Sequence, residues 1–136
     1  MGFELIGHTA DIAVAAKGDT LDTAFAAIAD GMAAAQCEEV PSGGDRFSVS
    51  VEAGSIEALL FDYLDELIYQ RDVRNVLPVD NEVDIELEDG GYHLMGTARG
   101  VALEQISARE VKAVTYSEME VEKQEDGWRV YVVLDV

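Results

Sequence analysis

Hydrophobic residues repeat with two different periods along this chain, and the two periods separate predicted helices from predicted strands. Over residues 55–70, apolar side chains recur at steps of three and four residues, which places them on one face of a helix. Ser55 is suited to cap the amino end of this helix, and Arg71 and Arg74 suit its negative carboxyl end. A weaker helical pattern follows Thr20, which is a second candidate cap. Its shared apolar face comprises Leu21, Phe25, Ile28 and Met32.

Alternation with a period of two marks the predicted strands. Residues 47–51 and 83–87 alternate apolar and polar side chains, as half-buried strands require. The sequences Asp89-Gly90 and Asp126-Gly127 tolerate the positive φ angles of tight turns, so each is expected to join two antiparallel strands. Residues 2–6 and 11–17 form a further short pair. Together these elements predict an α+β fold, a two-layer sandwich in which a mainly antiparallel sheet carries two helices on one face.

Length and composition indicate a single globular domain over residues 1–136. Hydrophobic residues make up 49% of the chain, enough for a packed core. The one cysteine, Cys37, cannot form an internal disulfide. No positively charged start followed by an apolar run of signal length precedes it, so we expect a cytoplasmic protein. No apolar run reaches the ~20 residues of a membrane helix, so we expect no membrane segment.

Acidic residues dominate the charged set. The chain has 28 Asp and Glu against 9 Lys and Arg, which gives a formal net charge of −19. Such a surface repels phosphates, so direct binding of nucleic acid is not expected. In molar salt the screening length falls to about 3 Å, and abundant carboxylates keep a protein surface hydrated. The composition therefore also predicts a halophilic, salt-adapted protein.

Two short segments near the ends of the chain carry the strongest candidate chemistry. The first is His8-Thr9-Ala10-Asp11, and the second is Leu134-Asp135-Val136, where the chain is expected to end in a free α-carboxylate. If folding brings them together, the side chains of Asp11 and Asp135 and the Val136 carboxylate form an all-oxygen cluster suited to a hard cation. On the residues alone, a turn role for His8 and a capping or turn role for Asp11 are open alternatives.

The scarce cations gather in one further region. Arg99, Arg109 and Lys112 bracket a glycine-containing loop, and Lys112 stands just before a predicted strand. Lys112 has two interpretations: a functional cation near carboxylates, or an ion pair with Glu118 or Glu110. Spacing alone favours the ion pair.

Three motifs taken together resemble those of the archease family. They are His-Thr-Ala-Asp-Ile at 8–12, Lys-Ala-Val-Thr-Tyr at 112–116 and Val-Val-Leu-Asp-Val at 132–136. Each is weak alone, but their order and the length of the chain make the combination specific. The chain departs from the family pattern at Ser117, where many archeases have histidine. This departure puts in doubt any role that needs an imidazole at that position.

The resemblance implies an activator of an RtcB-type RNA ligase in tRNA splicing, and a protein that is not itself an enzyme. Similar proteins are thought to promote guanylylation of a ligase histidine, and so multiple turnover, with a divalent metal held at an acidic site. Carried over to this chain, Asp11, Asp135 and Val136 would be metal ligands. His8, Lys112 and Glu118 are candidate supporting residues. Calcium is the expected ion, and magnesium and manganese also suit oxygen ligands.

Two other classes of function are alternatives. A chaperone-like module would bind many client proteins and would not need Asp11 or Asp135. A metal-dependent hydrolase would need a general base, and His8 beside Asp11 is the only candidate base in that motif. Dependence on the two aspartates therefore separates a ligase activator from a chaperone, and activity without a ligase would favour the hydrolase.

Overall fold

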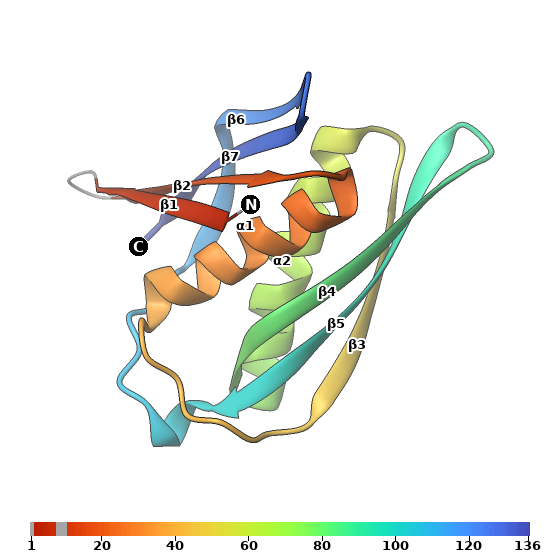
Figure 1. Ribbon diagram of the computed structural model, residues 1–136. Helices are drawn as coiled ribbons and strands as arrows, with labels where there is room; N and C mark the ends of the chain where they lie inside the picture. The colour runs from red at the N-terminus through yellow and green to blue at the C-terminus, as the bar shows by residue number, and fades with distance from the viewer. Residues whose placement is uncertain (1, 8–10) are drawn as a thin grey trace.

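The computed structural model describes residues 2–7 and 11–136, and over these residues the chain forms two antiparallel sheets and two α-helices (Figure 1). This arrangement confirms the predicted α+β class. In chain order the elements are β1 (Gly2–Gly7), β2 (Asp11–Gly18), α1 (Leu21–Gln36), β3 (Arg46–Ala53), α2 (Ile56–Arg74), β4 (Val76–Glu88), β5 (Gly91–Ala102), the 3-10 turn η1 (Leu103–Gln105), β6 (Ala113–Gln124) and β7 (Gly127–Asp135).

The strands divide between a four-stranded sheet of order β1-β2-β7-β6 and a three-stranded sheet of order β3-β5-β4. The predicted β1–β2, β4–β5 and β6–β7 pairs are confirmed as antiparallel. The first and last hairpins of the chain are joined side by side through β2 and β7. Alternation reports only which face of a strand is buried, so the sequence pattern did not show that the strands belong to two sheets.

Both predicted helix caps are present. The Ser55 hydroxyl accepts a hydrogen bond from the Ala58 backbone N–H at 3.1 Å, and Thr20 accepts one from the Thr23 N–H at 3.1 Å. The Thr23 hydroxyl in turn accepts from the Thr20 N–H, so the bonds at this end are reciprocal. Helix α2 continues one turn beyond the predicted end and stops where Asn75 adopts the left-handed conformation, with φ of 57°.

The helices fill the space between the two sheets, and each sheet turns one face toward them (Figure 1). Helix α1 packs against β1, β2, β4 and β7, whereas α2 packs against β3, β4, β5 and β6. The rings of Phe25 and Tyr63, fully buried on α1 and α2, stack with centroids 6.4 Å apart. Gly31 lets α1 approach the four-stranded sheet closely, because a Cβ there would lie 2.5 Å from Cγ1 of Val14. One core therefore joins both helices to both sheets.

No helix within the described residues is long and apolar enough to cross a membrane.

Candidate metal-binding site

The register of β2 against β7 sets Asp11 directly opposite Asp135. Side chains of residues directly opposite in an antiparallel pair project from the same face, with Cβ atoms about 4.5–5.5 Å apart. The two aspartates are thus neighbours, although 123 other positions separate them along the sequence. The predicted meeting of the two ends is observed for this pair, and its role as a metal site stays a prediction.

Hydrophobic alternation fixes the face on which the two carboxylates lie. Ile12 and Leu134, the next residues in register, are buried in the core between sheet and helices. Asp11 and Asp135 therefore project from the opposite, outer face of the four-stranded sheet. Reversing this orientation would bury two carboxylates and expose two large apolar side chains.

The local environment strengthens the interaction between the two carboxylates. Asp135 is exposed, but Asp11 is half-buried and one of its carboxylate oxygens is fully buried. Ala13 and Val133, which follow along the same outer face, are buried as well, so the base of the pair is apolar. Like charges repel more strongly beside such a surface than in bulk water, and a cation between them relieves the repulsion.

The third predicted ligand is the α-carboxylate expected at Val136. The Val136 side chain is half-buried and packs against the main core, which holds the chain beyond β7 close to the two aspartates. Over residues 2–7 and 11–136, no group of three or more His, Cys, Asp and Glu side chains is placed to hold a metal. The donors that the strand register brings together are the two aspartate side chains. An all-oxygen set of this kind fits calcium, magnesium or manganese rather than zinc.

Lys112 lies beside the pair, and its main chain makes the contact. Its backbone N–H donates to the Asp135 carbonyl oxygen at 2.7 Å. The ion pair predicted from spacing is wrong, since no bridge joins Lys112 to Glu110 or Glu118 in the described part of the chain. Glu118 does not pair with Lys112 because the strand is irregular at this point. The β6–β7 register shifts between Thr115 and Glu120, and Glu118 adopts a φ of 59° within that irregularity.

Thr115 is a residue of this region that sequence reasoning did not single out. It lies opposite Val133 while Ala113 lies opposite Asp135, so Thr115 is a diagonal neighbour of Asp135 on the same outer face. Its hydroxyl oxygen is buried and has no hydrogen-bond partner among the described residues. Buried polar groups in native proteins usually have a partner. The alternation within residues 113–115 was the available signal, because it puts Thr115 and Asp135 on one face.

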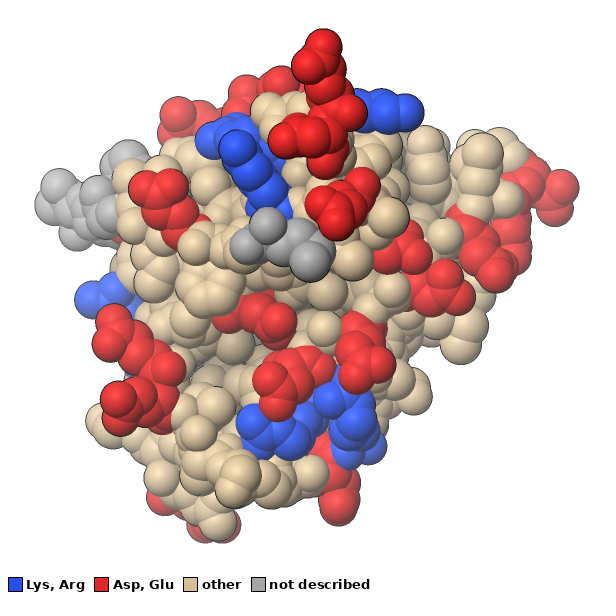
Figure 2. All heavy atoms as spheres, in the orientation of Figure 1, with Lys and Arg blue, Asp and Glu red and all other residues tan. Residues whose placement is uncertain are grey.

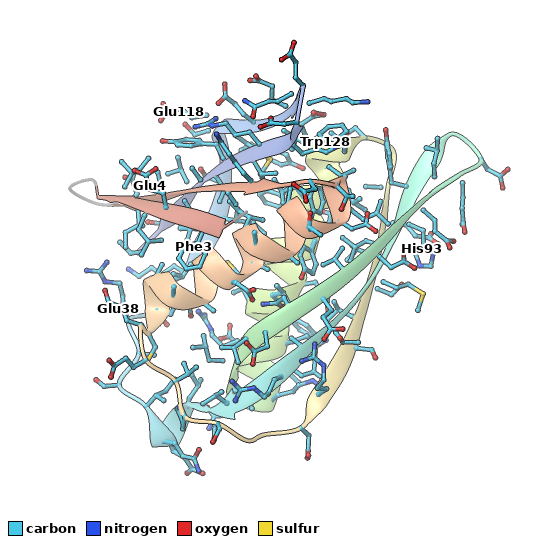
Figure 3. All side chains as sticks on the ribbon, viewed as in Figure 1. Phe3, Glu4, Glu38, His93, Glu118 and Trp128 are labelled. Carbon is cyan, nitrogen blue, oxygen red and sulfur yellow. The ribbon has the colours of Figure 1, made fainter. Side chains whose placement is uncertain are left out.

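The chain has two histidines, of which only His8 was predicted to support the site. His8 lies outside the described residues. Figure 3 shows His93 on the three-stranded sheet, on the other side of the molecule from Glu4 and Glu118. A hydrogen bond of 2.8 Å joins Nε2 of His93 to the Ser50 hydroxyl oxygen. His93 therefore belongs to a different surface from the aspartate pair.

Each member of the predicted basic group has contacts of its own: the backbone N–H of Arg109 donates to the Gln36 carbonyl oxygen, and that of Lys112 to the Asp135 carbonyl oxygen. Arg99 pairs with Asp80 at 2.8 Å and also donates to the carbonyl oxygens of Pro41 and Gly43, so its charge anchors a loop. Figure 2 shows carboxylates spread widely over the visible face, with Lys and Arg in a few separate places. The face seen in Figure 2 therefore has no broad basic patch of the kind that nucleic acid would need.

Known proteins resemble this chain over nearly its whole length. The family described as "Archease protein family (MTH1598/TM1083)" matches residues 3–136. Relatives named Protein archease include that of Pyrococcus furiosus, 35% identical over 135 residues, covering 95% of this chain and 94% of the relative. That of Thermococcus kodakarensis is 38% identical with the same coverage.

Two solved structures share the architecture. The solution structure of protein 1598 from Methanobacterium thermoautotrophicum has a TM-score of 0.84 and 32% identity, and the match covers 99% of each chain. A crystal structure from Thermotoga maritima, described as an archease and possible chaperone, has a TM-score of 0.63 over 96% of this chain and 94% of that chain. At 23% identity, the second likeness concerns the fold alone.

Proposed function

Because this chain belongs to the archease family, we propose that it activates an RtcB-type RNA ligase in tRNA splicing by promoting guanylylation of the ligase. The observation that carries the proposal is the register of Asp11 against Asp135, which sets a carboxylate from each end of the chain side by side. In this function the chain is a protein cofactor, and the ligase performs the chemistry.

Asp11, Asp135 and the Val136 α-carboxylate would hold a divalent cation, with calcium expected ahead of magnesium or manganese. A divalent ion bound there would supply positive charge against nucleotide phosphates while the guanylyl group is transferred. The part played by the chain itself is to orient the ligands. Both aspartates project from paired strands whose next residues, Ile12 and Leu134, are buried, so little freedom is lost when they bind.

Neighbouring residues would support this site. Lys112 is tied to Asp135 through the main chain, which leaves its ammonium group available as a second positive contact for phosphate. The Thr115 hydroxyl lies on the same face as Asp135 and is suited to donate a hydrogen bond to a carboxylate. His8, close to Asp11 in sequence, and Glu118, in the β6 irregularity, are further supporting residues.

The acidic surface supports a protein partner. With a net charge of −19, the chain is suited to bind a basic ligase while the ligase holds the RNA. We expect the two proteins to meet in the cytoplasm and the RNA to make no direct contact with this chain. The Thermotoga maritima structure is described as a possible chaperone, but at 23% identity that likeness carries the fold and not the role.

Single-turnover guanylylation of the cognate ligase tests the proposal. Wild-type protein, Asp11→Asn, Asp135→Asn and a variant lacking Val136 would be compared at fixed calcium concentration. The matched control is Asp84→Asn, because Asp84 is also exposed on a strand but lies opposite Met95 on the three-stranded sheet, not on the sheet that holds the aspartate pair. We expect wild type and control to stimulate the ligase, and the other three variants to lose most of the stimulation.

Equal stimulation by all variants would refute the role of the acidic site. Broad suppression of aggregation of unrelated proteins, unaffected by these changes, would favour the chaperone.

A further inference from the structure

We propose that α2 and β6 together form a docking surface for an arginine-bearing, basic face of a protein partner. We call it the α2–β6 surface. Its members are Phe61, Asp62, Asp65, Tyr69 and Val73 of α2 and Tyr116 of β6.

Large apolar side chains on this surface are exposed. Tyr69 is 58% exposed, Val73 62% and Tyr116 55%. Exposed apolar side chains that are grouped and bordered by polar residues are typical of protein interaction sites. Along α2, Phe61, Asp65, Tyr69 and Val73 follow one another at four-residue steps, so they form one continuous row on the helix.

The row continues onto β6 through an aromatic stack. The rings of Phe61 and Tyr116 lie 4.2 Å apart between centroids and 3° from parallel. Phe61 is half-buried against the core, so it fixes the position of the exposed Tyr116 ring. A ring held in this way loses little freedom when a partner covers it, which favours binding.

Two carboxylates on the α2–β6 surface are available to a partner. Asp62 and Asp65 are exposed, and neither has a hydrogen bond or ion pair with any other described residue. Their neighbours on α2 are engaged: Glu66 accepts from Gln70 at 2.6 Å, and Asp72 pairs with Arg71 at 3.0 Å. The surface therefore alternates aromatic rings with unengaged carboxylates.

This alternation fits arginine better than other partner groups. A guanidinium stacks on the face of Tyr or Phe and also bonds a carboxylate through two parallel N–H groups. A second copy of this chain fits poorly, because a two-fold contact would set Asp62 and Asp65 of one copy against the same residues of the other. Nucleic acid would meet the same carboxylates with its phosphates.

The inference deepens the proposed function, and it rests on that function for the identity of the partner as the ligase. The α2–β6 surface shares no residue with the aspartate pair on β2 and β7. Docking and activation are therefore expected to fail through different substitutions.

The test measures the affinity of purified ligase for the immobilised chain, together with stimulation of guanylylation. The variant is Asp65→Lys with Tyr69→Ala, and its matched control is Glu88→Lys with Leu87→Ala at the β4–β5 hairpin, where Leu87 is 72% exposed. We expect the α2–β6 variant to bind at least about tenfold more weakly and the control to bind as wild type. Wild-type binding should weaken as salt is raised. All substituted side chains are exposed, and thermal unfolding would verify that each variant is folded.

The outcomes separate the two proposals. If wild type stimulates the ligase and the α2–β6 variant binds as tightly as its control, the docking inference is overturned while the proposed function stands. If wild type neither binds nor stimulates the ligase, the proposed function fails, and the assignment of this surface to the ligase fails with it.

Discussion

In the absence of metal, Asp135→Asn should be more stable than wild type. In the presence of calcium, it should be less stable than wild type. The substitution removes one of two carboxylates that face each other across β2 and β7. It keeps the size of the side chain, and it does not disturb the bond from Lys112, which goes to the main-chain carbonyl of residue 135. Asn and Asp are similarly unfavourable in strands, so propensity contributes little.

The magnitude follows from the separation of the two charges. Two unit charges about 5 Å apart repel by roughly 0.8 kcal/mol in water and about 3 kcal/mol at the effective dielectric of a protein surface. Because Asp135 is exposed while Asp11 is half-buried, the lower part of this range applies, about 1 kcal/mol. For a chain of this length, this corresponds to a rise in Tm of about 3 °C.

Calcium should make the Tm of wild type higher than that of Asp135→Asn. Calcium at about 100 times its Kd stabilises the folded wild type by about 2.7 kcal/mol, which corresponds to roughly 9 °C. Asp135→Asn loses one ligand and should gain much less.

Thermal unfolding by circular dichroism, with chelator or with calcium at constant ionic strength, measures both effects. Asp84→Asn controls for the loss of one charge from an acidic chain and should show no reversal. The same order of Tm values in chelator and in calcium would refute the reasoning.

Three further predictions concern stability. Burial raises the pKa of Asp30 above its usual 3.8, although Asn81 donates to it through its backbone and side-chain N–H groups, so ionisation of Asp30 opposes folding above the raised pKa. The free energy of unfolding of Asp30→Asn should therefore exceed that of wild type most near pH 7, and this difference should disappear as pH falls through the raised pKa toward 3.8. Urea unfolding at several pH values checks this. A difference that does not change with pH would contradict it. Arg71→Met should lower the free energy of unfolding, measured in urea, by about 2–4 kcal/mol. The buried guanidinium donates to the Gln36 side chain at 2.7 Å and to the Val111 carbonyl at 2.8 Å, and both acceptors would lose their donor. A change below about 0.5 kcal/mol would show that water replaces the guanidinium. Thermal stability should rise from dilute buffer to molar salt as self-repulsion at a net charge of −19 is screened, and equal Tm values would contradict the expected adaptation to salt.

Local signals in the sequence predicted the elements well. Ser55 and Thr20 cap the helices as expected, because a hydroxyl just before a helix accepts a hydrogen bond from a backbone N–H of its first turn. Gly90 and Gly127 adopt positive φ in the two hairpins, as the Asp-Gly sequences predicted. The division of the strands into two sheets depends on packing between distant segments, which no local period reports.

The candidate site shows the same limit. Periodicity could not pair Asp11 with Asp135. The residues alone suggested an acidic cluster only if folding brought the two ends together, and the family resemblance supplied the expectation that it does. Arg71 appeared to be a favourable charge at a helix end, yet its side chain is buried and ties α2 to α1 and to the segment before β6. Spacing predicted Glu118 as an ion-pair partner of Lys112, but the strand register is irregular between Thr115 and Glu120.

A crystal structure of the chain grown with calcium tests the central claim most directly. The account predicts an anomalous peak at the outer face of β2 and β7, within about 2.3–2.6 Å of carboxylate oxygens from both Asp11 and Asp135. Calcium bound elsewhere while these two carboxylates have none would contradict it.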